Sequence, residues 1–409
     1  MKTTSNKLSF VFLLSFVIAS SYGHGADGLG FKAVSAGGSF SASHSLFLRH
    51  DGEVWAAGSN LTGAVGDGTG YARPAPTLIM TDVASISAGP LHSLFLKKDS
   101  SVWAVGWVGF GALGDGHTGE CARITPVRIM TGTMAVSAGS GHSLFLKKDD
   151  TVWGSGYNGH GELGDGSKTD RSLPVQIMAD VVAISAGGGF SLFLKKDGSV
   201  WASGNNKYGQ LGDGSKTERL LPVRVMSGVV AISAGGNHSL FLKSDGTVWA
   251  SGRNIYGALG DGTTADRVLP ALIMTDVAAI SAGVEFSLFV KTDETVWGTG
   301  MNRFGQLGTG TKLEPTTPVQ IMENVKGVSA GENFSLFLTN DGAVFGVGQN
   351  RSGQLGVEGQ KFFTPVEISF CGRTRSEVEA EKQAWDETMR NDRSSLIVQI
   401  LTDPPRTHE

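Results

Sequence analysis

Four histidines are the first residues that could do chemistry, because each occupies the same place in a repeated segment, directly before Ser-Leu-Phe: His44, His92, His142 and His238. Imidazole nitrogens arranged in a ring could bind a metal such as zinc. Three further copies of the segment have phenylalanine at this place: Phe190, Phe286 and Phe334. A position that accepts phenylalanine in the same chain is a packing position, so we predict no metal site.

Five aspartates in repeated Gly-Asp-Gly tripeptides could equally form a cation-binding set: Asp67, Asp115, Asp165, Asp213 and Asp261. In the same five copies an arginine precedes the closing proline of the loop by three residues: Arg73, Arg123, Arg171, Arg219 and Arg267. The other two copies lack both members, with Thr309 and Pro315 in one and Val357 and Phe362 in the other. Because the two residue types disappear together, we predict an aspartate–arginine ion pair inside each loop, worth about 0–1 kcal/mol if exposed.

Two motifs of catalytic proteins also occur, but neither has the context that its chemistry requires. Residues 327–331 match the G-x-S-x-G elbow of hydrolases, yet six other copies have the same Ser-Ala-Gly without the first glycine. Residues 109–114 and 159–164 match G-x-G-x-x-G, but a polar loop rather than a helix follows each. We therefore predict no catalytic residues, no cofactor and no metal, and a protein that is not an enzyme.

All of these residues belong to one repeat, which is marked by the tripeptide Ser-Ala-Gly. The tripeptide begins at seven positions: Ser35, Ser87, Ser137, Ser185, Ser233, Ser281 and Ser329. A period of about 40–50 residues with several short strands in each copy is typical of β-propellers. The sequence therefore predicts an all-β fold, a seven-bladed β-propeller over residues 30–370.

Each copy contains a predicted hairpin. Residues 191–195 and 200–203 are apolar, β-branched or aromatic, and Asp197 and Gly198 between them suit a tight turn. Consecutive Leu-Phe-Leu residues place apolar side chains on both faces of the strand, as expected for a sheet between two neighbours. A tryptophan in six of the copies is predicted to pack in the core.

The two ends of the repeat region complement each other. Residues 365–369 have no Ser-Ala-Gly strand after them, and residues 32–37 have no Pro-Val-x-Ile strand before them. We predict that these two segments pair in one mixed blade, which would close the ring without a free strand edge.

The segments before and after the repeat region predict an export signal and a C-terminal tail, respectively. Residues 1–23 contain Lys2 and Lys7, then an apolar run of about a dozen residues, then small residues, which is the layout of a signal peptide. The run is shorter than the roughly 20 residues that span a bilayer, and no later segment is apolar enough to do so. We expect a secreted chain, extracellular or periplasmic. Residues 374–409 contain strong helix formers and predict a short, partly helical C-terminal tail.

Composition narrows the choice of partner. The formal net charge of −4 gives no basic field for a phosphate backbone, so we expect no nucleic acid partner. Only Cys121 and Cys371 could form a disulfide, and the sequence leaves both the bonded and the free state open. We expect a monomer that binds another protein.

The motifs resemble the paired signatures of the regulator-of-chromosome-condensation repeat family, G-x-x-H-S-L and N-x-x-G-Q-L-G. They stand here at residues 235–240 and 206–212, and the resemblance covers about residues 30–370. It implies a seven-bladed propeller. Members of that family include a nuclear exchange factor for a small GTPase, regulatory domains, and secreted bacterial propellers that inhibit β-lactamases. The expected export makes this chain similar to the secreted branch.

The loops that follow the tryptophan strands carry the candidate binding residues. Because the copies are related by rotation, equivalent loops emerge on one face and place aromatic side chains in an arc: Trp107, Phe110, Tyr157, His160, Tyr208, Tyr256 and Phe304. Aromatic residues on a rigid rim often dominate binding energy. The alternative, that Phe110 and its equivalents pack against adjacent loops, stays open. Trp107 departs from its equivalents in a copy where Val108 replaces the loop asparagine.

These observations favour a secreted binding module that recognises a protein through loops on one face. Two alternatives remain: a guanine nucleotide exchange factor-like regulator of a small GTPase, and a carbohydrate- or cell-surface-associated protein.

Overall fold

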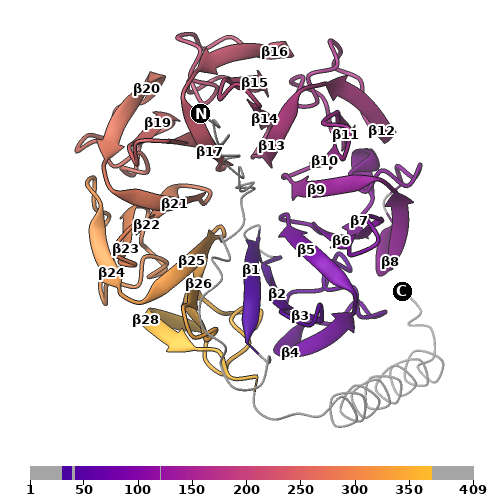
Figure 1. The fold of residues 1–409 in the computed structure, drawn as a ribbon. Helices are drawn as coiled ribbons and strands as arrows, with labels where there is room; N and C mark the ends of the chain where they lie inside the picture. The colour runs from indigo at the N-terminus through magenta and orange to yellow at the C-terminus, as the bar shows by residue number, and fades with distance from the viewer. Residues whose placement is uncertain (1–29, 39–41, 120, 371–409) are drawn as a thin grey trace, which may run out of the picture. The chain divides into compact units, whose positions relative to one another are not determined.

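The computed structural model describes residues 30–38, 42–119 and 121–370, and within them 28 strands form seven four-stranded antiparallel sheets around a central axis (Figure 1). The predicted seven-bladed, all-β propeller is confirmed. The predicted signal peptide, the C-terminal tail and Cys371 lie outside the described residues. No helix in the described part is long and apolar enough to cross a membrane.

The four strands of each blade follow chain order from the central channel to the rim. The first strands line the channel: β1 (Phe31–Gly37), β5 (Val83–Ala88), β9 (Thr133–Ala138), β13 (Val181–Ala186), β17 (Val229–Ala234), β21 (Val277–Ala282) and β25 (Val325–Ala330). The second strands carry the Leu-Phe-Leu motif or its equivalent: β2 (His44–Arg49), β6 (His92–Lys97), β10 (His142–Lys147), β14 (Phe190–Lys195), β18 (His238–Lys243), β22 (Phe286–Lys291) and β26 (Phe334–Thr339).

The third and fourth strands complete each blade. The third strands carry tryptophan, or phenylalanine in the last blade: β3 (Val54–Gly58), β7 (Val102–Trp107), β11 (Val152–Gly156), β15 (Val200–Gly204), β19 (Val248–Gly252), β23 (Val296–Gly300) and β27 (Val344–Gln349). The fourth strands lie at the rim: β4 (Arg73–Met80), β8 (Ala122–Met130), β12 (Arg171–Met178), β16 (Arg219–Met226), β20 (Arg267–Met274), β24 (Val319–Met322) and β28 (Lys361–Glu367). We number the blades 1 to 7 from β1–β4 to β25–β28.

The second and third strands are joined by a hairpin whose last turn residue is left-handed. In blade 4 the Lys195 amide donates to the carbonyl of Ser199 at 2.9 Å, and Gly198 has φ +76°. Glycine adopts this conformation without a steric cost. Three copies place other residues there, and these residues take the same conformation: Ser100 (φ +67°), Asp150 (+64°) and Glu294 (+66°).

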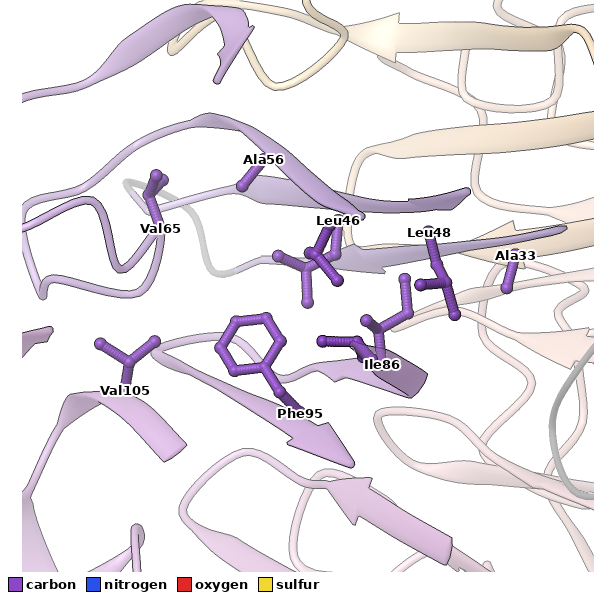
Figure 2. Close-up of a cluster of buried hydrophobic side chains, with 10 residues drawn as sticks. Ala33, Leu46, Leu48, Ala56, Val65, Ile86, Phe95 and Val105 are labelled. Carbon is purple, nitrogen blue, oxygen red and sulfur yellow. The ribbon is translucent and has the colours of Figure 1, made fainter. Parts of the chain in front are cut away.

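The hydrophobic core lies between blades rather than within them (Figure 2). Leu46 and Leu48 of β2 pack with Phe95 of β6 in one cluster, because alternate side chains of a strand point to opposite faces. In five further clusters the aliphatic residues of the second strand likewise meet the phenylalanine of the next blade. Leu144, Phe145 and Leu146 are all fully buried, which confirms the prediction that both faces of this strand are covered.

The prediction that the two ends share a mixed blade is wrong. Pro365 lies in β28, which pairs with β27, while β1 pairs with β2. Each repeat therefore coincides with one blade. The reason is the two-residue link between a rim strand and the next channel strand, whose second residue is left-handed in all six links: Asp82, Gly132, Asp180, Gly228, Asp276 and Asn324. Aspartate, asparagine and glycine tolerate this conformation best, and the link carries the chain into the next blade instead of back along the same one.

Side-chain hydrogen bonds close the ring. The Ala36 amide of blade 1 donates to the hydroxyl of Ser329 in blade 7 at 2.9 Å. The same alanine-to-serine bond, at 2.9–3.0 Å, joins each of the other six pairs of neighbouring blades, with acceptors Ser35, Ser87, Ser137, Ser185, Ser233 and Ser281. The serine of Ser-Ala-Gly is thus a bridge between blades.

Candidate functional site

One face of the propeller carries the loops that could contact a partner. In an antiparallel blade, the connections from first to second strand and from third to fourth strand emerge on the same side. We call this side the loop face. The hairpins between second and third strands lie on the opposite side.

A buried asparagine shapes the long loop of most blades. In blade 4 the Asn206 amide donates to Asp213 at 2.9 Å, and its oxygen accepts the Leu211 amide at 3.1 Å. Asn206 is fully buried. Equivalent asparagines stand in five other blades: Asn60, Asn158, Asn254, Asn302 and Asn350. This amide takes the place of backbone partners that an irregular loop lacks.

The predicted aspartate–arginine ion pairs are confirmed in all five loops. Arg219 lies 2.7 Å from Asp213, and equivalent pairs are Asp115–Arg123 at 2.9 Å, Asp165–Arg171 at 2.7 Å, Asp261–Arg267 at 2.7 Å, and Asp67–Arg73. Burial alone would raise the pKa of Asp213, but hydrogen bonds from Arg219 and from the neighbouring serine and asparagine lower it below the usual value. In blade 6, Thr309 accepts the asparagine amide instead.

The four repeated histidines are buried bridges between blades. The Nε2 atom of His238 lies 2.9 Å from the hydroxyl of Ser287 in the next blade. That hydroxyl donates to the Ala258 carbonyl at 2.7 Å, so its oxygen accepts the hydrogen bond and Nε2–H of His238 is the donor. Burial lowers the pKa of His238 to about 4. His44, His92 and His142 make the same contact with Ser93, Ser143 and Ser191. No group of three or more metal-ligating side chains occurs in the described ranges.

The loop of blade 2 departs from the others. Val108 stands where six blades have asparagine, and a short 3-10 helix (Gly109–Gly111) follows it. Phe110 inside this helix has φ +57°, which makes it the only aromatic residue in the described part with a left-handed backbone. Its side chain is 45% exposed. Residues held in such sparsely populated conformations concentrate at functional sites.

Four aromatic side chains from blades 2 and 3 form a continuous aromatic patch on the loop face. The ring centroids of Trp107 and Phe110 are 5.3 Å apart, those of Phe110 and Tyr157 are 5.0 Å apart, and those of Tyr157 and His160 are 6.2 Å apart. The planes of neighbouring rings meet at 56–81°. These contacts, two edge-to-face and one tilted, hold the rings in place before any partner binds.

The other three predicted residues are covered by cations of the next blade. Arg253 lies 5.1 Å from the ring of Tyr208, Arg303 lies 4.9 Å from that of Tyr256, and Lys361 lies 5.4 Å from that of Phe304. Arg253 also pairs with Glu285, which is 6% exposed. The structure thus brings Trp107, Phe110, Tyr157 and His160 together, while the other three rings take part in packing between loops.

Sequence reasoning missed the covering cations and a buried acidic residue, Glu332. Arg253 occupies the column that holds Trp107 and Tyr157, one blade after Tyr208. The sequence carries no signal for its stacking on Tyr208, because that contact depends on how two neighbouring loops meet. Cys121 is exposed in the loop of blade 2.

A closed ring of seven four-stranded blades, with inter-blade serine bonds and loops shaped by buried asparagines, defines a repeat β-propeller. Within that class the chain belongs to the family of the RCC1-like domain, whose model matches residues 24–275 and 179–386. The family expected from the motifs is confirmed.

Solved structures share the fold at low sequence identity. Human WBSCR16 is 21% identical, with 78% of this chain and 94% of that chain covered and a TM-score of 0.70. Prp20p from Saccharomyces cerevisiae is 20% identical, with 84% and 97% covered and a TM-score of 0.72. The ectodomain of the Physcomitrella patens receptor kinase CR4 is 16% identical, with 78% and 73% covered and a TM-score of 0.50. No curated protein matches the chain.

Proposed function

We propose that this chain is an exported protein-binding module whose principal contact is the aromatic patch. The observation that carries the proposal is Phe110: it is exposed, left-handed, and packed between Trp107 and Tyr157 in the one loop that has lost its asparagine. Among the aromatic residues at this position of the loops, Phe110 alone is exposed, whereas His160, Tyr208, Tyr256 and Phe304 are half-buried.

The geometry of the patch favours a protein over a sugar or a nucleic acid. Neighbouring rings meet at 56–81°, so they do not form one flat platform on which sugar or base rings stack. The tilted rings of Trp107, Phe110 and Tyr157 instead present aromatic surface suited to aliphatic and aromatic side chains. Because the rings already hold one another, little side-chain entropy is lost on binding.

Export is part of the same proposal. Residues 1–23 have the layout of a signal peptide, and the CR4 ectodomain is an extracellular protein with a related fold. An inhibitor of a secreted enzyme, such as the β-lactamase inhibitors of the secreted branch, fits an exported propeller that displays a rigid apolar contact.

A second candidate is a regulator of a small GTPase. The solved structure of Prp20p is described together with its binding to Gsp1p and histones. An exported chain would not meet a cytosolic GTPase. Detection of the mature chain outside the cytoplasm, with its N-terminus after residue 23, supports the first candidate; an intact N-terminus in the cytoplasm supports the second.

The binding test compares Phe110→Ala with a matched control, Leu313→Ala, which removes another exposed apolar side chain from blade 6. The tagged full chain is incubated with extracellular material, and captured proteins are quantified by mass spectrometry. Purified β-lactamases and a nucleotide exchange assay are run in parallel.

We expect Phe110→Ala to reduce capture of the partner at least tenfold, which is about 1.4 kcal/mol, and to leave the melting temperature unchanged. Leu313→Ala should retain capture. Equal capture by both variants, or a loss of capture that follows unfolding of Phe110→Ala, would overturn the proposal.

A further inference from the structure

The central channel opens on the loop face through a mouth with one charged side chain. The channel encloses about 160 Å³ between the first strands, and the mouth encloses about 80 Å³ between the loops that follow them. Glycine and alanine provide most of the lining of the mouth. Glu332 is the one charged residue among the described residues that line either cavity.

Glu332 has no partner for its charge in the described part of the chain. The residue is 4% exposed, and its Oε2 atom has no hydrogen bond. The adjacent Asn333 is 1% exposed, and both polar atoms of its side chain also lack partners. Burial raises the pKa of Glu332 to about 7. By contrast, the chain supplies Arg253 to the buried Glu285 on the same face.

The fold does not require an acid at this place. The equivalent positions in other blades hold neutral residues: Pro90, Ser140, Gly188, Gly236 and Val284. In four of them the backbone amide makes the structural contact, donating to a glycine carbonyl of the next blade, as Gly188 does to Gly235 at 3.0 Å. The side chain at this position is therefore free to serve a ligand.

We propose that the mouth of the channel binds the ammonium group of a lysine side chain, presented by the protein partner, with Glu332 as its counter-ion. This inference rests on the proposed function, because it assigns a second contact on the same face. An ammonium group carries a compact charge that one carboxylate can pair, and the methylene groups of lysine suit a wall of alanine and glycine.

A metal ion fits the mouth less well. The described residues contain no group of three or more histidine, cysteine, aspartate or glutamate side chains placed to hold one. A guanidinium group is also disfavoured, because its planar fork is best matched by a carboxylate reached along two parallel hydrogen bonds. The single buried Oε2 atom without a partner offers one such bond.

The test uses n-butylammonium as the probe and the full chain labelled with ²H and ¹⁵N. Amide signals of Gly283 and Gly331, which line the mouth, are followed at pH 8 as the probe is added. The variants are Glu332→Gln and the control Glu314→Gln, whose carboxylate pairs with Arg303 at 2.9 Å elsewhere on the molecule. Glu332→Ser, the residue type that blade 3 has at this place, serves if the glutamine variant alters signals beyond the mouth.

We expect saturable shifts for the natural chain and for Glu314→Gln, at least tenfold weaker binding for Glu332→Gln, and weaker binding at pH 6, where more of Glu332 is protonated. Equal responses of the natural chain and Glu332→Gln would overturn the inference. Displacement of n-butylammonium by an equal concentration of Ca²⁺ would overturn the assignment to lysine. Because no partner protein is used, failure here is distinct from failure of the aromatic patch.

Discussion

Replacement of His238 by phenylalanine should make the protein more resistant to acid. The histidine is fully buried, and burial lowers its pKa to about 4, whereas an unfolded histidine titrates near about 6.5. Below pH 6.5 the unfolded chain therefore binds a proton that the folded chain does not. The stabilising effect of a neutral His238 is complete above that pH and is lost as the pH falls towards 4.

The size of the effect follows from the two pKa values. Between pH 8 and pH 5, the folded and unfolded forms differ in the protonation of His238 over about 1.5 pH units. This difference lowers the free energy of unfolding by about 2 kcal/mol through this residue alone. Phenylalanine fits the position, because Phe190, Phe286 and Phe334 are fully buried at the same place in other blades. At pH 8 we expect the variant to be within about 1 kcal/mol of the natural chain, since Ser287 keeps its bond to the Ala258 carbonyl.

Urea unfolding at pH 8 and pH 5, followed by tryptophan fluorescence, measures this difference. Every other titrating group is present in both proteins, so the loss of stability on acidification should be smaller by about 2 kcal/mol in His238→Phe. Imidazole ¹⁵N shifts should also show the Nε2–H tautomer, with no titration of His238 between pH 8 and pH 5.5. Equal losses in the two proteins, or a titration of His238 near pH 6.5, would refute the reasoning.

Two further predictions concern the repeats. Glu294→Gly should raise the free energy of unfolding by about 1 kcal/mol, because glycine adopts the left-handed turn conformation without the steric cost of an L side chain. Gly198→Ala in blade 4 should lower the free energy of unfolding by a similar amount. Unchanged melting temperatures in both variants would contradict the strain argument. A double-mutant cycle with Asp213→Asn and Arg219→Gln should give a coupling of about 1 kcal/mol, reduced by salt because Arg219 is 36% exposed; zero coupling at low salt would show that the pair is incidental.

Comparison of the copies predicted what depends on equivalence within the chain. Three copies have phenylalanine where the others have His44 and its equivalents, which indicated a packing position. Two copies lack both the aspartate and the arginine of the loop, which indicated the ion pairs. Both follow from covariation between copies of one module. The spacing of Ser-Ala-Gly was likewise enough for the propeller.

Comparison of equivalent positions could not predict features that depend on how neighbouring blades lie in three dimensions. The assignment of residues 365–369 to a shared blade failed because the sequence does not show whether a two-residue link turns back as a hairpin or passes to the next sheet. The left-handed conformation of Asp82 and its equivalents is visible only in the structure. The stacking of Arg253 on Tyr208 depends on how two neighbouring loops meet, and a column of equivalent residues does not contain that information.

The junction between blade 7 and blade 1 uses the same alanine-to-serine bond as the six junctions that the chain crosses continuously. In the described part of the chain, this junction is therefore held by the same side-chain bond as the other six. A circularly permuted chain, opened at any of the two-residue links and with the native ends tethered, retains every inter-blade contact.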